Sequence, residues 1–438
     1  MLPGNGLAQE PGRVLAAFAI LFAPPGLSPL LRFPTGPIFH SGNAIREETS
    51  MTACIVGWSH TPFGKLDDET VESLIVRVAN EAMEHAGLGP EDIDEVVLGH
   101  FNGGFSPQDF TASLVFQASD KFRFKPATRV ENACATGSAA VHQAIKTIEA
   151  RRARTVLVVG VEQMTRTPGP EIGNILLKAS YLAEDGETKG GFAGVFGQIA
   201  GRYFQRYGDQ SDALAMIAAK NHQNGVDNPY AQMRKDLGFE FCRAESDKNP
   251  FVAGPLKRTD CSLVSDGAAA LILADTETAL RMPRAVAFRA TAHAQDFLPM
   301  SKRDIVQFEG CSEAWRRALD QAGIALTDLS FVETHDCFTI AELIEYEAMG
   351  LTPPGQGATA VKEGWTNRDG KLPVNPSGGL KAKGHPIGAT GVSMHALTAM
   401  QLCGEAGGMQ VEGAKLGGVF NMGGAAVANY VSVLERVR

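Results

Sequence analysis

Residues 335–338 read His-Asp-Cys-Phe, so an imidazole, a carboxylate and a thiol stand side by side after an apolar run. If a strand continues through them, His335 and Cys337 lie on one face and Asp336 points away. An imidazole and a thiol on one face suit proton transfer, whereas a structural histidine beside a buried thiol is the plainer alternative. No additional ligand pair at a metal-like spacing accompanies them, so we expect no metal site. Asp336 is predicted to be an outward structural residue.

A second thiol, Cys134, stands in VENACATGSAAVHQAI (130–145), where a predicted strand turns into a helix of small residues. The positive end of a helix dipole lowers the pKa of a thiol, and free N–H groups there can hold an oxyanion. Cys134 is therefore predicted to be a nucleophile, with a buried structural cysteine at a tight turn as the alternative.

A histidine on a glycine-rich loop, His385, precedes a predicted helix in NPSGGLKAKGHPIGATG (375–391). Such a histidine suits work as a general base or as the charge partner of a thiolate. Lys381 and Lys383 are expected to be solvated rather than to bind a phosphate.

A fourth segment, GGVFNMGGAAVANYV (417–431), contains Gly423 and Gly424. Glycines there could bring backbone N–H groups close to a ligand. A simple turn at the end of a strand explains them almost as well.

The elements that must position these groups occur twice in the chain. Residues 82–101 resemble residues 318–338, and each reads as a helix end, a turn with an aspartate and an apolar strand. Gly87 and Gly323 are predicted to end the two helices. Further matches pair 134–150 with 388–404, including His142 and His395, and 265–275 with 422–435. Strands and helices alternate in both copies, which predicts a duplicated α/β unit.

The duplication is interrupted by residues 165–258, which have no counterpart in the second half and are predicted to be a partly helical insertion over an active site. The first fifty residues are predicted to lie outside the fold. The predicted organisation is an extension (1–50), an N-terminal half (51–164 plus 259–278), a loop domain (165–258) and a C-terminal half (279–438).

Bulk composition excludes several classes of protein. The 438 residues carry a formal net charge of −9, which argues against a general nucleic-acid binder. Seven cysteines without a CxxC pair fit reduced thiols and a cytoplasmic location. The apolar run at 14–33 is interrupted by Pro24 and Pro25 and is too short to span a membrane, so no membrane span is expected.

The four segments together resemble the thiolase superfamily, in particular the sterol carrier protein 2 type of thiolase and acetyl-CoA acetyltransferases. The resemblance extends over nearly all of residues 51–438 and includes the SDGAAAL turn that begins at Ser265. It implies two fused α/β halves in a five-layer αβαβα core with an inserted loop domain. It also implies coenzyme A and acyl-CoA as substrates without another cofactor, and a homodimer or homotetramer.

The resemblance also assigns roles to the candidate residues. Cys134 matches the nucleophile that becomes acylated, and His385 matches the histidine that activates it. Other thiolases carry a second catalytic cysteine where this chain has Asn421, and in the sterol carrier type the cysteine of His-Asp-Cys-Phe is thought to take its place, here Cys337. The resemblance also implies that His335 and His385 together hold the thioester oxygen. The backbone N–H groups of Gly423 and Cys134 are expected to bind a second oxyanion, and Phe338 and Ser265 are expected to contact the substrate.

The implied activity is that of an acyl-CoA C-acyltransferase in lipid metabolism, such as fatty-acid β-oxidation. It cleaves a 3-ketoacyl-CoA with CoA, or condenses acetyl-CoA in reverse, through an acyl-cysteine. One alternative is a retro-aldolase that depends on a small OB-fold partner protein. Another is a non-catalytic acyl-CoA or lipid-binding subunit of the same fold. The retained Cys134, Cys337 and His385 favour the acyltransferase.

Overall fold

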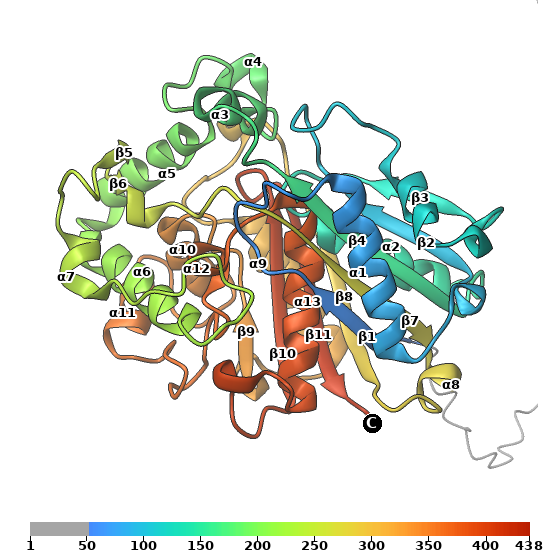
Figure 1. The fold of residues 1–438 in the computed structure, drawn as a ribbon. Coiled ribbons are helices and arrows are strands. Elements are labelled where there is room, and N and C mark those ends of the chain that lie inside the picture. Colours follow the sequence, from blue (N-terminus) through green and yellow to red (C-terminus); the bar gives the residue numbers. More distant parts are fainter. Residues whose placement is uncertain (1–51) are drawn as a thin grey trace, which may run out of the picture. The chain divides into compact units, whose positions relative to one another are not determined.

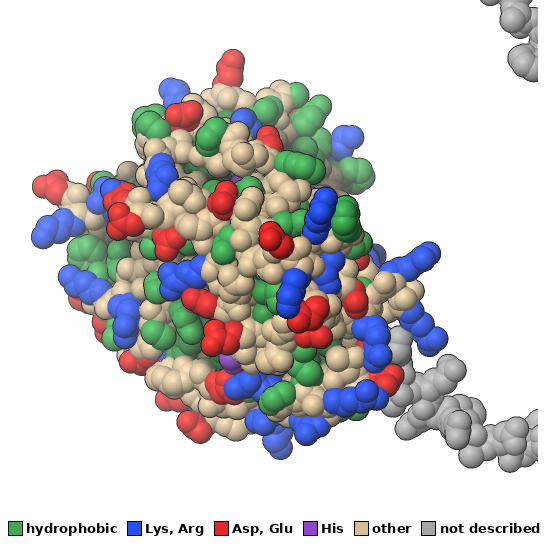
Figure 2. Space-filling model, turned by 45° about the vertical axis from the view of Figure 1, so that its right-hand side comes forward, with side chains coloured by type: hydrophobic (Ala, Val, Ile, Leu, Met, Phe, Trp, Pro, Cys, Tyr) green, Lys and Arg blue, Asp and Glu red, His purple; other side chains and the backbone are tan. Residues whose placement is uncertain are grey.

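The computed structural model describes residues 52–438, and the predicted extension, residues 1–50, lies outside the described residues. Within that part of the chain, none of the helices combines the length and the apolar character needed to cross a membrane. Figure 2 shows acidic and basic side chains interspersed over one face of the protein, so this face carries no patch of a single charge.

Nine strands form one mixed sheet in the order β3-β2-β4-β7-β1-β8-β11-β10-β9. β1 and β8 are adjacent at the centre, and outward from them β7, β4 and β2 correspond to β11, β10 and β9, while β3 at one edge has no counterpart. Two pairings, Cys54 with Ala287 and Ile55 with Val286, join the halves. The strands are β1 (Ala53–His60), β2 (Glu95–Gly99), β3 (Ala127–Val130), β4 (Thr155–Gln163), β7 (Asp266–Asp275), β8 (Val286–Gln295), β9 (Phe331–Glu333), β10 (Leu416–Gly423) and β11 (Ala428–Arg436).

The sheet and its helices stack in five layers (Figure 1). These layers are α1, the N-terminal half of the sheet, α2 with α13, the C-terminal half of the sheet, and α9. The outer helix α1 contacts β1, β4 and β7, and α9 contacts β8 and β11. Between the halves, α2 packs against α13, and α13 contacts strands of both halves. The predicted αβαβα architecture is therefore confirmed. These and the remaining helices of this core are α1 (Val71–Ala86), α2 (Thr136–Glu149), α8 (Thr276–Ala279), α9 (Glu309–Ala322), α10 (Thr339–Ala348), α11 (Gly357–Lys362), α12 (Gly379–Lys383) and α13 (Ile387–Cys403).

The duplication predicted from the sequence is confirmed in detail. Gly87 ends α1 with φ 70°, and Gly323 ends α9 with φ 63°, both in the left-handed region that glycine tolerates best. A single 3₁₀ turn and then a strand follow each glycine, at Pro90–Asp92 before β2 and at Leu326–Asp328 before β9.

The segment 165–258 contributes no strand to the main sheet. Its two short strands pair with each other, and its helices contact the C-terminal half through α5 and α6, which touch α10 (Figure 1). The exact boundaries of a loop domain stay a prediction. The elements here are α3 (Gly169–Leu177), α4 (Leu182–Asp185), α5 (Gly191–Tyr207), α6 (Ser211–Gly225), α7 (Gly238–Arg243), β5 (Phe251–Ala253) and β6 (Leu256–Lys257).

Glycines let the first turns of α2 and α13 touch. A Cβ atom at Gly137 would lie 2.7 Å from the backbone nitrogens of Gly391 and Val392. A Cβ at Gly160 in β4 would lie 2.5 Å from the carbonyl oxygen of Gly388. Separations this small leave no room for a side chain, so the backbones of the two central helices and of β4 meet directly.

We expect Gly137→Ala to lower the free energy of unfolding by about 1–3 kcal/mol, because the added methyl group forces α2 and α13 apart. The matched control is Gly201→Ala in α5, where the glycine is exposed and an added Cβ meets nothing within 4 Å. The control should raise stability by about 0.5–1 kcal/mol through helix propensity alone. Denaturant unfolding measures both, and equal stability of the two variants would contradict the close-packing argument.

Candidate active site

Cys134 lies in the turn between β3 and α2. Ala133 adopts a left-handed conformation with φ 49°, which is uncommon for a residue with a side chain and makes the turn sharp. The Thr136 hydroxyl accepts a hydrogen bond from the Asn132 N–H (2.9 Å) and donates one to the Ala133 carbonyl (2.6 Å). The turn is therefore fixed from both sides, and the thiol lies against the cavity described below.

His385 is held with one ring nitrogen free. Its backbone N–H donates to the Ser265 hydroxyl (3.0 Å), and its Nδ1 lies 2.7 Å from the Thr390 hydroxyl. The Thr390 hydroxyl also lies 3.0 Å from the Pro386 carbonyl, which can only accept; when Thr390 gives its proton there, its oxygen accepts from Nδ1–H of His385. The proton of His385 is thereby placed on Nδ1. Its buried Nε2 has no hydrogen-bond partner among residues 52–438 and carries the lone pair that a general base needs.

His335 is held in the opposite tautomer. The Asn421 amide nitrogen donates to the Cys134 carbonyl (3.1 Å) and lies 2.8 Å from Nδ1 of His335. Because a carbonyl only accepts, the nitrogen of this amide must face it, and His335 Nδ1 must then accept. The proton of His335 is thereby placed on Nε2, which likewise has no hydrogen-bond partner within the described part of the chain. The two rings meet edge to face, with centroids 5.0 Å apart.

Cys134, His335 and His385 form one buried cluster. Each offers a ligand atom, and the three atoms lie within 4.8 Å of one another. Within residues 52–438 this is the one group of three such side chains that could hold a metal ion, although the tautomers described above suit proton transfer equally well. The absence of a metal stays a prediction.

Burial keeps the cluster neutral. It raises the pKa of the Cys134 thiol to about 12, which a hydrogen bond from the Gly424 N–H opposes and the charges of Glu131 and Glu162 reinforce. Burial, with the nearby Lys383, also lowers the pKa of His385 to about 3 and holds that of His335 well below its usual range. The prediction that the helix start gives Cys134 a low pKa is therefore wrong, since desolvation outweighs the dipole. At rest, Cys134 is therefore a thiol beside two neutral imidazoles.

The His-Asp-Cys-Phe segment does not continue a strand, because β9 ends at Glu333. The predicted strand is therefore wrong, although His335 and Cys337 both lie beside Cys134 and Asp336 turns away toward α12. Asp336 is buried, so the prediction that it points outward is also wrong. Its buried carboxylate accepts hydrogen bonds from the N–H groups of Leu380 (2.6 Å) and Lys381 (3.1 Å) and from the Asn221 side chain (2.8 Å). Asp336 thus ties this segment to α12, which leads into His385. Burial, then repulsion from a neighbouring glutamate, raises the pKa of Asp336 to about 7.

Both lysines of α12 are buried, so the prediction that they are solvated is wrong. Lys381 donates to the Cys261 carbonyl (2.6 Å), and Lys383 donates to the Ser393 hydroxyl (2.9 Å). Burial lowers the pKa of each, with the opposing attraction of Asp336 among the causes. The sequence could not show this, because the Asp336 carboxylate that binds the first N–H groups of α12 is distant in the chain.

A cavity of about 290 Å³ opens onto Cys134, Cys337 and His385. Phe338 lies in its wall and stacks on Phe196 with ring centroids 4.4 Å apart, and its contact with substrate stays a prediction. Cys337 is buried, and desolvation followed by the neighbouring Cys134 raises the pKa of its thiol well above the usual range. The remaining lining is mostly apolar and contains one charged side chain: Met164, Gly173, Leu176, Gly190, Phe192, Ala193, Val252, Arg258, Cys261, Ser262, Leu263, Val264 and Ile387.

Two predicted contact residues take supporting places. Ser265 does not line the cavity, since its hydroxyl holds the His385 backbone and donates to the Gln232 side chain (2.5 Å). A Cβ at Gly423 would collide with the Asn132 carbonyl, so this glycine allows close approach to the Cys134 turn. The Gly424 N–H donates a hydrogen bond to the Cys134 sulfur, so one of the two glycines indicated by the sequence places its N–H at the site. Oxyanion binding by Gly423 stays a prediction.

Two protein families match this chain over most of its length. The thiolase N-terminal domain family matches residues 53–277, and the thiolase C-terminal domain-like family matches residues 292–436. The chain belongs to the thiolase family. It is 35% identical over 387 residues to an acetyl-CoA acetyltransferase of Methanothermobacter thermautotrophicus, covering 87% of this chain and 99% of that relative. The prediction of an acyltransferase is confirmed at this level.

Two further similarities refine the placement. The chain is 32% identical to sterol carrier protein 2 of Bos taurus, covering 85% of this chain and 70% of the relative, which confirms the predicted resemblance to that type. A solved structure described as an Ltp2-ChsH2(DUF35) aldolase superposes with a TM-score of 0.75 over 88% of this chain and 98% of that one. At 20% identity this likeness concerns the fold alone.

Two residues that the sequence did not indicate, Asn421 and Thr390, hold the two histidines of the cluster. Asn421 was noted only as a missing cysteine, yet it sets the tautomer of His335. Thr390 sets the tautomer of His385, and its place in the first turn of the following helix is the signal that could have found it.

We expect Asn421→Asp to reduce turnover by about 10²–10³-fold, because a carboxylate accepts from Nδ1 of His335 and removes the Nε2–H donor. The same carboxylate would repel the Cys134 carbonyl. The readouts are kcat and the ¹⁵N shifts of His335. Asn249→Asp is the control, because Asn249 is also buried and donates to carbonyls, but in the loop segment. Unchanged His335 shifts with full turnover would refute the tautomer assignment.

Proposed function

We propose that this thiolase-family acyltransferase exchanges acyl groups between CoA thioesters through an acyl-Cys134 intermediate. The observation that carries the proposal is the pair of opposite tautomers beside one buried thiol. Nε2 of His385 can take a proton, and Nε2–H of His335 can donate a hydrogen bond to an oxygen that becomes negative.

In the first half-reaction, His385 takes the proton of Cys134 while the sulfur attacks the 3-keto carbon of a 3-ketoacyl-CoA. The C2–C3 bond breaks, and the electron pair leaves on the enolate of acetyl-CoA. Cys337, which lines the same cavity, gives its proton to that enolate. The site then holds an acyl-Cys134, a His385 imidazolium and a Cys337 thiolate.

In the second half-reaction, the Cys337 thiolate takes the proton of an entering CoA thiol. The CoA sulfur attacks the acyl-Cys134 carbonyl, and the Cys134 sulfur leaves and recovers its proton from His385. All protons return to their starting places, so the same steps run in reverse as the condensation of two acetyl groups. The direction in the cell follows substrate supply.

The substrate class we propose is acyl-CoA, with CoA and no other cofactor. The mostly apolar cavity wall suits an acyl chain and the apolar part of pantetheine, and Arg258 offers a positive charge for a phosphate of CoA. A homodimer or homotetramer, a cytoplasmic location and a part in fatty-acid β-oxidation are proposed on the family resemblance alone.

A partner-dependent retro-aldolase is the second candidate. The specific observation in its favour is the fold match to the solved structure described as an Ltp2-ChsH2(DUF35) aldolase. An aldolase needs no acyl-enzyme, whereas Cys134, Cys337 and His385 here lie around one cavity. We therefore place the acyltransferase first and test the two against each other.

The deciding experiment follows CoA-dependent consumption of acetoacetyl-CoA and of a longer 3-ketoacyl-CoA by the full chain. We expect consumption by the wild type and labelling of Cys134 with an acyl group in peptide mass spectrometry. Cys134→Ala should lose both signals. Acylation of another residue in that variant would contradict the proposed nucleophile, and no consumption by a folded wild type would favour the aldolase.

Cys337→Ala should still acylate Cys134 but lose carbon–carbon bond formation by about 10²–10⁴-fold, because the acid that protonates the enolate is gone. The measurement pairs single-turnover acylation with condensation of acetyl-CoA. Cys242→Ala is the matched control, since Cys242 is a buried thiol outside the cavity lining. Full condensation by Cys337→Ala would show that this thiol is structural.

A further inference from the structure

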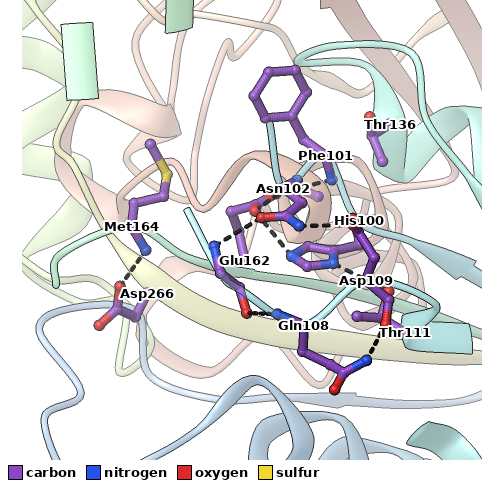
Figure 3. A network of polar contacts seen from close by, with 12 residues as sticks. His100, Phe101, Asn102, Gln108, Asp109, Thr111, Thr136, Glu162, Met164 and Asp266 are labelled. Atoms are coloured by element: carbon purple, nitrogen blue, oxygen red, sulfur yellow. Dashed lines mark hydrogen bonds and ion pairs between the residues drawn. The ribbon is translucent and has the colours of Figure 1, made fainter. Parts of the chain in front are cut away.

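Glu162 is a fully buried carboxylate near the end of β4 that the proposed reaction does not use. One oxygen accepts hydrogen bonds from the N–H groups of Phe101 and Gly388, both at 3.1 Å. The other accepts from the Asn102 N–H at 3.1 Å and lies 3.1 Å from Nε2 of His100. Figure 3 shows the carboxylate between the His100 ring and the backbone of Phe101 and Asn102.

The bond to Gly388 caps a helix from outside. α13 begins at Ile387, and its N-cap residue, Pro386, provides no side-chain acceptor. The first N–H groups of a helix need partners and carry a partial positive charge, so a carboxylate from β4 is a favourable substitute. β4 belongs to the N-terminal half and α13 to the C-terminal half. Glu162 therefore joins the two halves at the start of α13.

Both catalytic groups depend on the backbone that Glu162 holds. His385 precedes the N-cap of α13, and its ring is fixed by Thr390 in the first turn of that helix. Phe101 and Ile387, on either side of the carboxylate, pack together with Cys134 in one apolar cluster. A shift of Gly388 relative to β4 would therefore move His385 relative to Cys134.

We propose that Glu162 is a positioning residue that fixes the His385 base against the Cys134 thiol across the boundary between the two halves. The inference rests on the proposed function only in taking His385 as the base for Cys134. Loss of the Glu162 charge by itself would ease ionisation of the Cys134 thiol, so a carboxylate without a positioning role would leave alkylation equal or faster when it is removed. Removal of a positioning carboxylate must instead lower the reactivity of Cys134, and it must do so through His385.

The test uses Glu162→Gln in the full chain. Glutamine keeps the size but brings an N–H₂ group against N–H donors. We expect alkylation of Cys134 by iodoacetamide, resolved by peptide mass spectrometry, to slow by about 10²-fold, the cost of misplacing a reacting group by about 1 Å. The control is Asp275→Asn, a largely buried carboxylate that caps α8 and contacts none of these residues. It should lower stability and leave alkylation unchanged.

A double-mutant cycle with His385→Ala separates positioning from general loosening. If Glu162 acts through His385, the double variant should alkylate within about threefold of His385→Ala alone. Additive losses, or full reactivity of Glu162→Gln, would overturn the proposal. If Glu162→Gln fails to fold, His100→Gln and Glu162→Asp disturb the same carboxylate more gently. Each is then combined with His385→Ala, and alkylation of Cys134 in the double variant is compared with that of His385→Ala in the same way.

Acetylation of Cys134 by acetyl-CoA in a single turnover is measured beside alkylation. A wild type that alkylates with His385 dependence but never acetylates would refute the proposed function and leave the role of Glu162 standing. A wild type that acetylates, with a Glu162→Gln variant that does so at the same rate, would refute the role of Glu162 alone.

Discussion

Direct backbone contact between the first turns of α2 and α13 is the constraint from which the geometry of the site follows. Gly137, Gly160 and Gly388 leave no space for side chains between the two helices and β4. One helix begins just after Cys134, and the other begins just after His385. Because close-packed backbones have little freedom to slide, the thiol and the imidazole meet at a fixed separation although each comes from a different half.

The same close packing buries Cys134, His335 and His385 away from water, and this burial determines whether they are charged. Desolvation disfavours every ion, so both histidines of the cluster are neutral and Cys134 is a thiol at rest. Reactivity then depends on where protons lie rather than on permanent charges. Asn421 and Thr390 settle this by fixing opposite tautomers in His335 and His385.

Two buried carboxylates next to the site each accept hydrogen bonds from backbone N–H groups at the start of a helix, and so fix the position of that helix. Asp336 binds the N–H groups at the start of α12, and Glu162 binds the N–H of Gly388 at the start of α13. A carboxylate in such a place is strongly stabilised by N–H donors and strongly destabilised without them. The buried carboxylates of Asp336 and Glu162 therefore fix where the starts of α12 and α13 lie relative to the strands.

The sequence by itself determined the duplicated α/β plan and the choice of candidate reacting groups. Gly87 and Gly323 mark equivalent helix ends, and the settings of Cys134, Cys337 and His385 indicate a thiol–imidazole chemistry, because these signals are local in the chain. Only the tertiary structure decided burial and partnership. Asp336, Lys381 and Lys383 read as solvated or outward but are buried, and the dipole argument for Cys134 failed against desolvation. A pKa, a tautomer or a trans-cap such as Glu162 depends on groups far apart in the sequence, which no local pattern records.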